Sequence, residues 1–266
     1  MRVNKMDRGE IYQALEEEFA ATFIKELIPG ILHNFANPLN SIMGRSKLLQ
    51  RRIEEIAKKM EEIYPETAAG MKEDLQRIKT EIRAINQESE LFFDLFKSVT
   101  GKFYALDAKG ENRINLSQLL SEEMRFFNFY LDFKHEIKKV VQLNNDVPSF
   151  RGNNAELSLT FWKLIRFAMS RALSTSLKEF QIKTEYDNKY VSVFIRNSGG
   201  ALPASDIEAL MESVKSNSRE MVATVIDRGV LFSLLILNKY QARINIFSED
   251  NFSILSIGFP YLDLKS

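Results

Sequence analysis

The chain has 266 residues, and 45% of them are hydrophobic, which suffices for one large or two ordinary domains with packed cores. Lysine plus arginine and aspartate plus glutamate number 36 each, so the net charge is zero, which argues against a general nucleic-acid binder. Cysteine is absent, which excludes disulfides and thiolate metal sites and fits a reducing cytosol.

Signals for membrane insertion and secretion are also missing from the sequence. No uninterrupted apolar run is long enough to span a bilayer, and the stretch from Met1 to Glu18 is charged and lacks the apolar core of a signal peptide. We therefore expect a soluble, cytoplasmic protein that contacts neither a membrane nor nucleic acid.

The first predicted element is a helical region from about Ile11 to Ile63. Its apolar residues recur at spacings of three and four, as on one face of a helix: Ile24, Leu27, Ile28, Ile31, Leu32, Phe35, Leu39, Ile42, Met43, Leu49, Ile53, Ile56 and Met60. Pro29 and Pro38 interrupt the pattern, so we expect kinks there, and Pro65 ends it.

A second helical pattern follows and is expected to fold back on the first. Its apolar positions are Met71, Leu75, Ile78, Ile82, Ile85, Phe92, Leu95, Phe96 and Val99, and Gly101 marks its predicted end. Such a helical hairpin cannot bury apolar stripes of this length on its own. A homodimer that completes a four-helix bundle is the physical expectation, and packing of the stripes on the C-terminal part of the chain is the alternative.

After a polar bridge from Tyr104 to Asn112 the pattern becomes mixed α and β. The predicted strands cover residues 114–116, 136–143, 180–186, 190–196, 242–248 and 252–259. The predicted helices cover 119–133, with Ser117 as the cap, 154–173, 205–216 and 230–240. Helices beside a mixed sheet predict an α+β fold, in which the hairpin is followed by an α/β sandwich.

The most specific motif lies inside the first helical region and reads His33-Asn34-Phe35-Ala36-Asn37-Pro38-Leu39. Residues four apart share one face of a helix, and a proline just after them is expected to kink the helix where the imidazole projects. The ordered match resembles the H-box of two-component histidine kinases, in which the histidine carries a phosphoryl group. The alternative is a buried histidine that happens to precede a proline. Arg45 and Lys47 lie nearby and are read as ordinary solvated charges.

The order of the predicted elements resembles the Bergerat-type ATP-binding domain of histidine kinases, over nearly the whole chain from about residue 20. The resemblance implies a helical dimerisation and phosphotransfer domain at residues 1–103 and a catalytic-type α/β domain at 104–266. In the family, an asparagine on the long helix ligates the nucleotide-bound magnesium, but Phe167 stands there, and magnesium requires oxygen ligands. If this alignment were shifted, Asn153 or Asn154 would take the role, but both are expected to cap the helix.

The other two nucleotide boxes are altered as well. Asn197 stands where the family has an adenine-binding aspartate, with Gly199 retained beyond it. In the segment that resembles the glycine-rich phosphate loop, only Gly229 remains, and bulky Leu231 and Phe232 fill the other positions. Asn197, Gly199 and Gly229 are thus the remnants of a cofactor site that we expect not to function, so the chain is not expected to use ATP.

The H-box itself also departs from the kinase pattern. Asn34 stands where these kinases usually have an acidic residue that takes the ring proton, whereas Asn37 keeps a position that orients water in the family's phosphatase reaction. His33, Asn34 and Asn37 are the candidate catalytic residues, and the other histidine, His135, has no H-box around it.

The resemblance therefore implies a histidine phosphotransferase or pseudokinase of a phosphorelay. In this reading His33 exchanges phosphoryl groups with aspartates of receiver domains, and the Mg²⁺ belongs to the partner receiver, so no metal or cofactor of the chain's own is expected. The alternatives are an active histidine kinase with an unusual ATP site, a receiver phosphatase and a non-catalytic scaffold.

Overall fold

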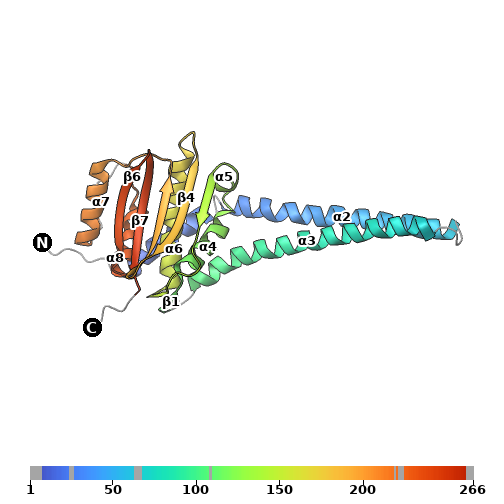
Figure 1. Cartoon of the computed structure of the whole chain (residues 1–266), viewed down its shortest axis with the longest axis horizontal. Helices are drawn as coiled ribbons and strands as arrows, with labels where there is room; N and C mark the ends of the chain where they lie inside the picture. Colours follow the sequence, from blue (N-terminus) through green and yellow to red (C-terminus); the bar gives the residue numbers. More distant parts are fainter. Residues whose placement is uncertain are drawn as a thin grey trace. The chain divides into compact units, whose positions relative to one another are not determined.

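The computed structural model describes residues 8–23, 27–62, 68–107, 110–218, 220 and 225–261, and along the two longest helices it describes only part of the side chains. The chain divides into two compact units, one of residues 28–100 and the other of residues 1–27 together with 101–266 (Figure 1). The grouping of residues 1–27 with the C-terminal part differs from the predicted helical domain of residues 1–103.

The first unit is the predicted helical hairpin, built from α2 (Ile28–Glu62) and α3 (Ala68–Asp107), whose last turns belong to the other unit. The rings of Phe35 and Phe92 lie 5.4 Å apart across the hairpin. Pro38 lies inside α2, which continues past it, and the kink expected there stays a prediction. A proline within a helix removes one backbone hydrogen bond, and the 35 residues of α2 supply many others.

The second unit is an α/β sandwich built on a five-stranded mixed sheet. Strand order is β2-β4-β5-β7-β6, and β2 is parallel to β4 while the other neighbours are antiparallel. The strands are β2 (Lys138–Gln142), β4 (Glu179–Tyr186), β5 (Tyr190–Asn197), β6 (Arg243–Glu249) and β7 (Phe252–Pro260). A separate two-stranded sheet pairs β1 (Asn112–Ile114) with β3 (Phe150–Gly152), a strand too short to be recognised from its sequence pattern.

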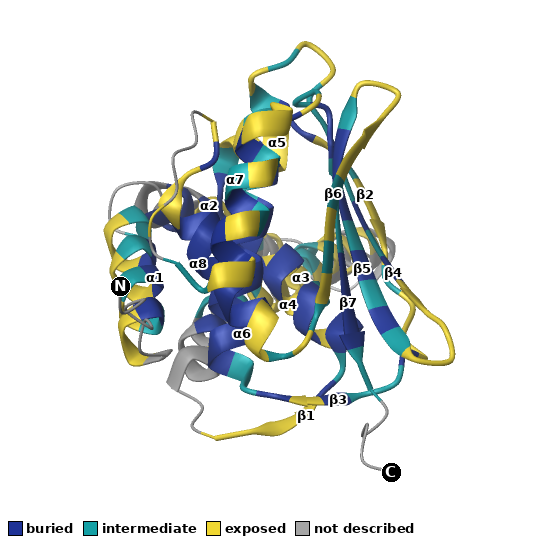
Figure 2. Ribbon diagram, turned by 90° about the vertical axis from the view of Figure 1, so that its left-hand side faces the viewer, coloured by how far each residue is buried: buried dark blue, intermediate teal, exposed yellow. Residues whose placement is uncertain are grey.

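Helices cover one face of the large sheet (Figure 2). They are α4 (Leu116–Phe127), α5 (Leu131–His135), α6 (Asn154–Leu173), α7 (Ala204–Ser216) and α8 (Arg228–Lys239), and a further helix, α1 (Arg8–Thr22), packs on α6 and α8. The alternating burial along β5 turns Val191, Val193 and Ile195 towards these helices. The predicted α+β class, with a helical hairpin before an α/β sandwich, is confirmed.

The helix starts show where local sequence was sufficient and where it was not. Asn153 caps α6 as predicted, because its side-chain oxygen accepts a hydrogen bond from the backbone N–H of Glu156 at 3.0 Å. The predicted cap at Ser117 is wrong: Asn115 caps α4, and the hydroxyl of Ser117 is buried against that of Thr184 at 2.7 Å. No described helix is both long and apolar enough to cross a membrane.

Candidate functional site

The H-box lies on α2, where His33, Asn34 and Asn37 fall within two turns of helix. The helical backbone places positions 33 and 37 on one face, since residues four apart stand one above the other. Asn37 is exposed and Asn34 is buried, whereas the side chain of His33 lies outside the described ones. The amide at position 37 is therefore exposed in the single chain.

The two cations near the H-box are not part of it. Arg45 forms an ion pair with Glu81 of α3 at 3.2 Å, and Lys47 is exposed. At the rise of an α-helix, Arg45 lies about 18 Å along the axis from His33. The reading of Arg45 and Lys47 as ordinary helix charges agrees with these positions.

In the α/β unit, residues from all three altered nucleotide boxes meet around one small apolar cavity. We call it the α6 cavity, and its lining is Leu164, Phe167, Ala168, Ile195, Asn197, Leu202, Leu210, Ile226, Val230, Leu234, Ile246, Ser253 and Leu255. Its volume is about 20 Å³, enough for roughly one water molecule. Phe167 and Asn197 line this cavity together, and Val230 follows directly after Gly229.

The buried side chain of Asn197 makes its hydrogen bonds within the chain. Its oxygen accepts from the backbone N–H of Gly199 at 3.0 Å, and its nitrogen donates to the carbonyl oxygen of Ser253 at 3.5 Å. Both ends of the amide are thus engaged in holding the end of β5, so the turn by itself accounts for the asparagine.

The glycine pair after β5 is likewise explained by the turn. The guanidinium of Arg171 on α6 donates to the carbonyl oxygens of Gly199 at 2.7 Å and Gly200 at 3.0 Å. Gly200 has φ of +75°, and a Cβ at Gly199 would lie 2.5 Å from the Cβ of Arg171. Partial burial lowers the pKa of Arg171, although a guanidinium stays charged at neutral pH.

The start of α8 is occupied by carboxylates. Asp227 caps the helix, accepting from the backbone N–H of Val230 at 3.0 Å, and it pairs with Lys163 of α6 at 3.1 Å. Lys163 also pairs with Glu18 of α1. A Cβ at Gly229 would lie within 3.0 Å of the Lys163 and Glu18 side chains, so this glycine makes room for the chain's own ion pairs.

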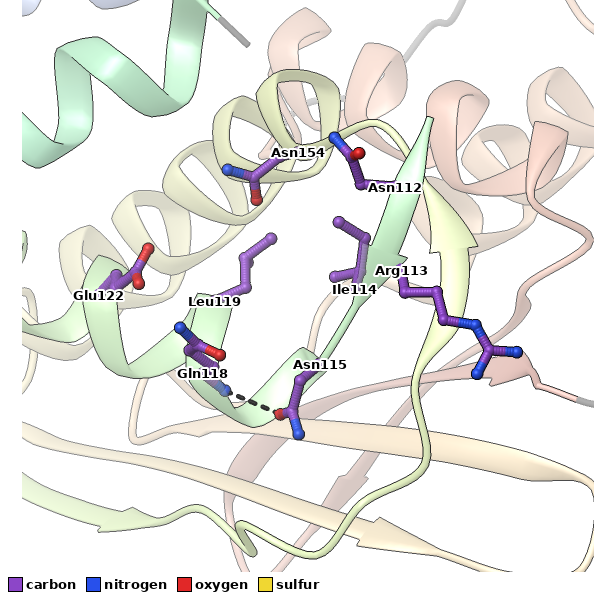
Figure 3. A pocket seen from close by; sticks show the side chains of 8 residues that line it. All are labelled: Asn112, Arg113, Ile114, Asn115, Gln118, Leu119, Glu122 and Asn154. Carbon is purple, nitrogen blue, oxygen red and sulfur yellow. Dashed lines mark hydrogen bonds between the residues drawn. The ribbon is translucent and has the colours of Figure 1, made fainter. Parts of the chain in front are cut away.

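The asparagines weighed as an alternative metal ligand lie elsewhere. Asn154 lines a polar hollow of about 260 Å³ between β1, α4 and the start of α6, together with Asn112, Arg113, Ile114, Asn115, Gln118, Leu119 and Glu122 (Figure 3). This lining shares no residue with the α6 cavity, and Asn154 precedes Phe167 by more than three helical turns. Asn154 is therefore separate from the cavity that Phe167 and Asn197 line, and the assignment of Phe167 to the metal position stays a prediction.

Sequence reasoning missed Glu18, Lys163 and Arg171. One signal was present, because Lys163 follows Phe161 and Trp162 in an apolar helix, where a buried ammonium requires a partner. The partner, Glu18, lies 145 residues away in the chain, so no local pattern identifies it.

The second histidine of the chain, His135, is exposed at the end of α5.

No family model and no curated protein matches the chain. Among solved structures, the histidine kinase AdeS of Acinetobacter baumannii is similar, with a TM-score of 0.44 and 12% identity over 82% of this chain and 96% of that one. The nucleotide-free catalytic domain of histidine kinase ThkA has a TM-score of 0.47 and 16% identity, over 57% of this chain and 98% of that one. The structure of ThkA in complex with the response regulator protein TrrA also has a TM-score of 0.47 and 16% identity, over 98% of this chain and 70% of that one.

Proposed function

We propose that this chain is a histidine phosphotransferase of a two-component phosphorelay, with His33 as the group that is phosphorylated. The partners are receiver domains of response regulators, and the chain uses no ATP. Support for the histidine comes from the ordered H-box on α2, and support for the loss of ATP use comes from the α/β unit.

In the proposed reaction a phosphoryl group moves from the aspartate of one receiver to His33 and then to the aspartate of a second receiver. An imidazole nitrogen of His33 attacks the phosphorus of a receiver's aspartyl phosphate in line, the N–P bond forms, and the P–O bond to the aspartate carboxylate breaks. A second receiver's aspartate then attacks the phospho-histidine, and His33 leaves as the free imidazole. The receiver's Mg²⁺ supplies charge neutralisation, so this chain needs no ligand for a metal.

The observation that supports the loss of ATP use is the close packing around the α6 cavity, where the three segments that resemble nucleotide boxes meet. The α6 cavity holds about 20 Å³ and is lined almost entirely by apolar side chains, with Phe167 at the metal position. The carboxylates of Asp227 and Glu18 lie at the start of α8, where the resemblance places phosphates. A triphosphate there would meet these two carboxylates, and the nearby cations Lys163 and Arg166 are already paired with them.

The first test is nucleotide binding. Isothermal titration of the chain with Mg-ATP at millimolar concentration is expected to give no one-site isotherm. Phe167 offers no oxygen to the metal, and the α6 cavity is too small for the adenine ring. An ATP-binding histidine kinase catalytic domain serves as the positive control. A clear isotherm with autophosphorylation on His33 would instead identify an active kinase.

We also propose that the chain acts as a homodimer through α2 and α3. A large apolar side chain of the predicted stripe remains exposed in the single chain: Ile82 of α3 is 41% exposed. A second copy that completes a four-helix bundle would cover such residues.

Light scattering of the full chain is expected to give twice the monomer mass. Ile82→Glu is expected to weaken the dimer at least tenfold in Kd, about 1.4 kcal/mol, because a carboxylate buried in an apolar interface loses its hydration. The control is Arg83→Glu, which reverses a charge at the exposed neighbouring position and is expected to leave the dimer mass unchanged. A concentration-independent monomer for the unaltered chain would rule out this interface.

A receiver phosphatase is the second candidate, and the exposure of Asn37 favours it. An exposed amide one helical turn after the histidine could hold a water molecule against a receiver's aspartyl phosphate. This role needs Asn37 and does not need phosphorylation of His33.

A further inference from the structure

Helix α1 packs on the side of α6 and α8 that faces away from the sheet (Figure 2). Ile11, Leu15 and Phe19 are buried, and they follow one another at intervals of four residues. This spacing forms a single apolar stripe along the helix. The opposite side of α1 is exposed and carries Glu16 and Glu17. Helix α1 is therefore an amphipathic helix seated on a surface that α6 and α8 provide.

The apolar end of this contact is aromatic. The ring of Phe19 meets the ring of Trp162 edge-on at 5.0 Å and lies 6.0 Å from the ring of Phe126. Trp162 is held in place because its indole N–H donates to the hydroxyl of Tyr130 at 2.8 Å. The seat of Phe19 is thus part of the α/β core.

The polar end of the contact is a cluster that we call the latch, made of Glu18, Lys163, Arg166 and Asp227. Lys163 is 4% exposed and pairs with both Glu18 and Asp227, and Arg166 lies 3.8 Å from Glu18. The two carboxylates are far more accessible, at 33% for Glu18 and 50% for Asp227. Water and salt therefore reach one side of the latch, which limits its strength.

A helix of this length is marginal on its own. Helix α1 has 15 residues, and isolated helices of about 12–15 residues are unstable in water, so α1 depends on its seat to remain folded. The contact buries three apolar side chains of α1 and adds one partly exposed latch. Only residues 23–27 separate α1 from α2, and His33 lies within the first two turns of α2.

We propose that the α6–α8 surface is a helix-docking site that α1 occupies reversibly, and that its occupancy controls phosphotransfer at His33. This inference rests on the proposed function, because phosphotransfer is its output. Docked α1 anchors the beginning of the H-box helix, and undocked α1 leaves that beginning free to fray. The α/β unit, which has lost its nucleotide, would in this way act as a regulatory dock.

The experiment uses the full chain and two readouts. Hydrogen–deuterium exchange of residues 8–22 reports docking, and transfer from a phosphorylated receiver reports activity. Glu18→Lys and Lys163→Glu are each expected to speed exchange at least tenfold and to slow transfer at least fivefold. The double variant Glu18→Lys/Lys163→Glu restores this one attraction with its sign reversed, but it places a carboxylate beside Asp227 and an ammonium beside Arg166. It is therefore expected to recover part of each loss, with both values closer to those of the unaltered chain than in either single variant.

The control is Glu17→Lys, which makes the same charge change one residue away on the exposed side of α1 and is expected to alter neither readout. If Lys163→Glu does not fold, the comparison of Glu18→Lys with Glu17→Lys in both readouts is sufficient to test the proposal. If hydrogen–deuterium exchange is unchanged in Glu18→Lys, the proposal that the latch holds α1 in place is wrong. If exchange is faster but transfer is unchanged, docking of α1 does not regulate phosphotransfer. If no receiver phosphorylates the unaltered chain while exchange behaves as expected, the docking site stands and the proposed function fails.

Discussion

His33→Ala is expected to abolish phosphorylation of this chain by a phosphorylated receiver domain, whereas His135→Ala leaves the reaction unchanged. Only a nitrogen nucleophile can accept the group in the proposed exchange, and alanine offers none. His135 lies at the end of the five-residue helix α5, outside any H-box, and its exposure alone does not assemble a docking surface for a receiver.

Each variant is incubated with magnesium and a receiver domain that carries a radiolabelled phosphoryl group, and the proteins are then separated and their label is measured. Label is expected on the unaltered chain and on His135→Ala, and none on His33→Ala. Label retained on His33→Ala would place the acceptor elsewhere. Matching melting curves for the two variants show that neither has lost its fold.

A third variant, Asn37→Ala, separates transfer from hydrolysis. If no receiver labels the unaltered chain, yet Asn37→Ala slows the loss of phosphate from a receiver, the chain is a phosphatase. If neither reaction occurs with any receiver from the same cell, the chain is a scaffold.

Local sequence signals predicted the elements of this fold where a residue's partner lies close in the chain. The helix at 154–173 has its cap, Asn153, one residue before its start, and the hairpin of β4 and β5 turns at residues 187–189. The prediction at Ser117 failed because the partner of its hydroxyl is Thr184, which lies 67 residues away. Ser117 therefore resembled a helix cap in the sequence while tertiary packing used it otherwise.

The candidate site shows the same division. The sequence alone predicts that Phe167 provides no oxygen ligand and that Leu231 and Phe232 are too large for a phosphate loop. Both predictions depend only on side-chain chemistry. The position of Glu18 at the start of α8 could not be predicted from the sequence. The apolar periodicity of α1 runs on into the next helix, so the pattern assigned α1 to the hairpin. Only the packing of α1 on α6 and α8 separates it from the hairpin.

The second large effect is expected at a buried ion pair in the α/β unit. The ammonium of Lys102, in the last turns of α3, lies 2.7 Å from both carboxylate oxygens of Glu123 on α4, and both side chains are 3% exposed. The hydroxyl of Ser158 on α6 is also 2.7 Å from this ammonium. Burial lowers the pKa of Lys102, while the charge of Glu123 opposes that shift. One cation thus joins α3, α4 and α6 within this unit.

Removing either partner leaves the other charge buried and unpaired. Lys102→Met and Glu123→Leu are therefore each expected to lower the free energy of unfolding by about 3–5 kcal/mol. The double variant Lys102→Met/Glu123→Leu is expected to lose much less than the sum, because no uncompensated charge remains in it. The control is Glu122→Ala, which removes an exposed carboxylate next to Glu123 and is expected to change stability by about 0.5 kcal/mol or less.

Urea unfolding followed by circular dichroism measures all four variants against the unaltered chain. Single losses that simply add in the double variant would show that Lys102 and Glu123 act through packing and not through their charges. A coupling that returns most of the lost stability would show that the paired charges hold the end of α3 to the α/β unit. Because α3 is the second helix of the H-box hairpin, this pair would then anchor the end of α3, as docked α1 is proposed to anchor the beginning of α2.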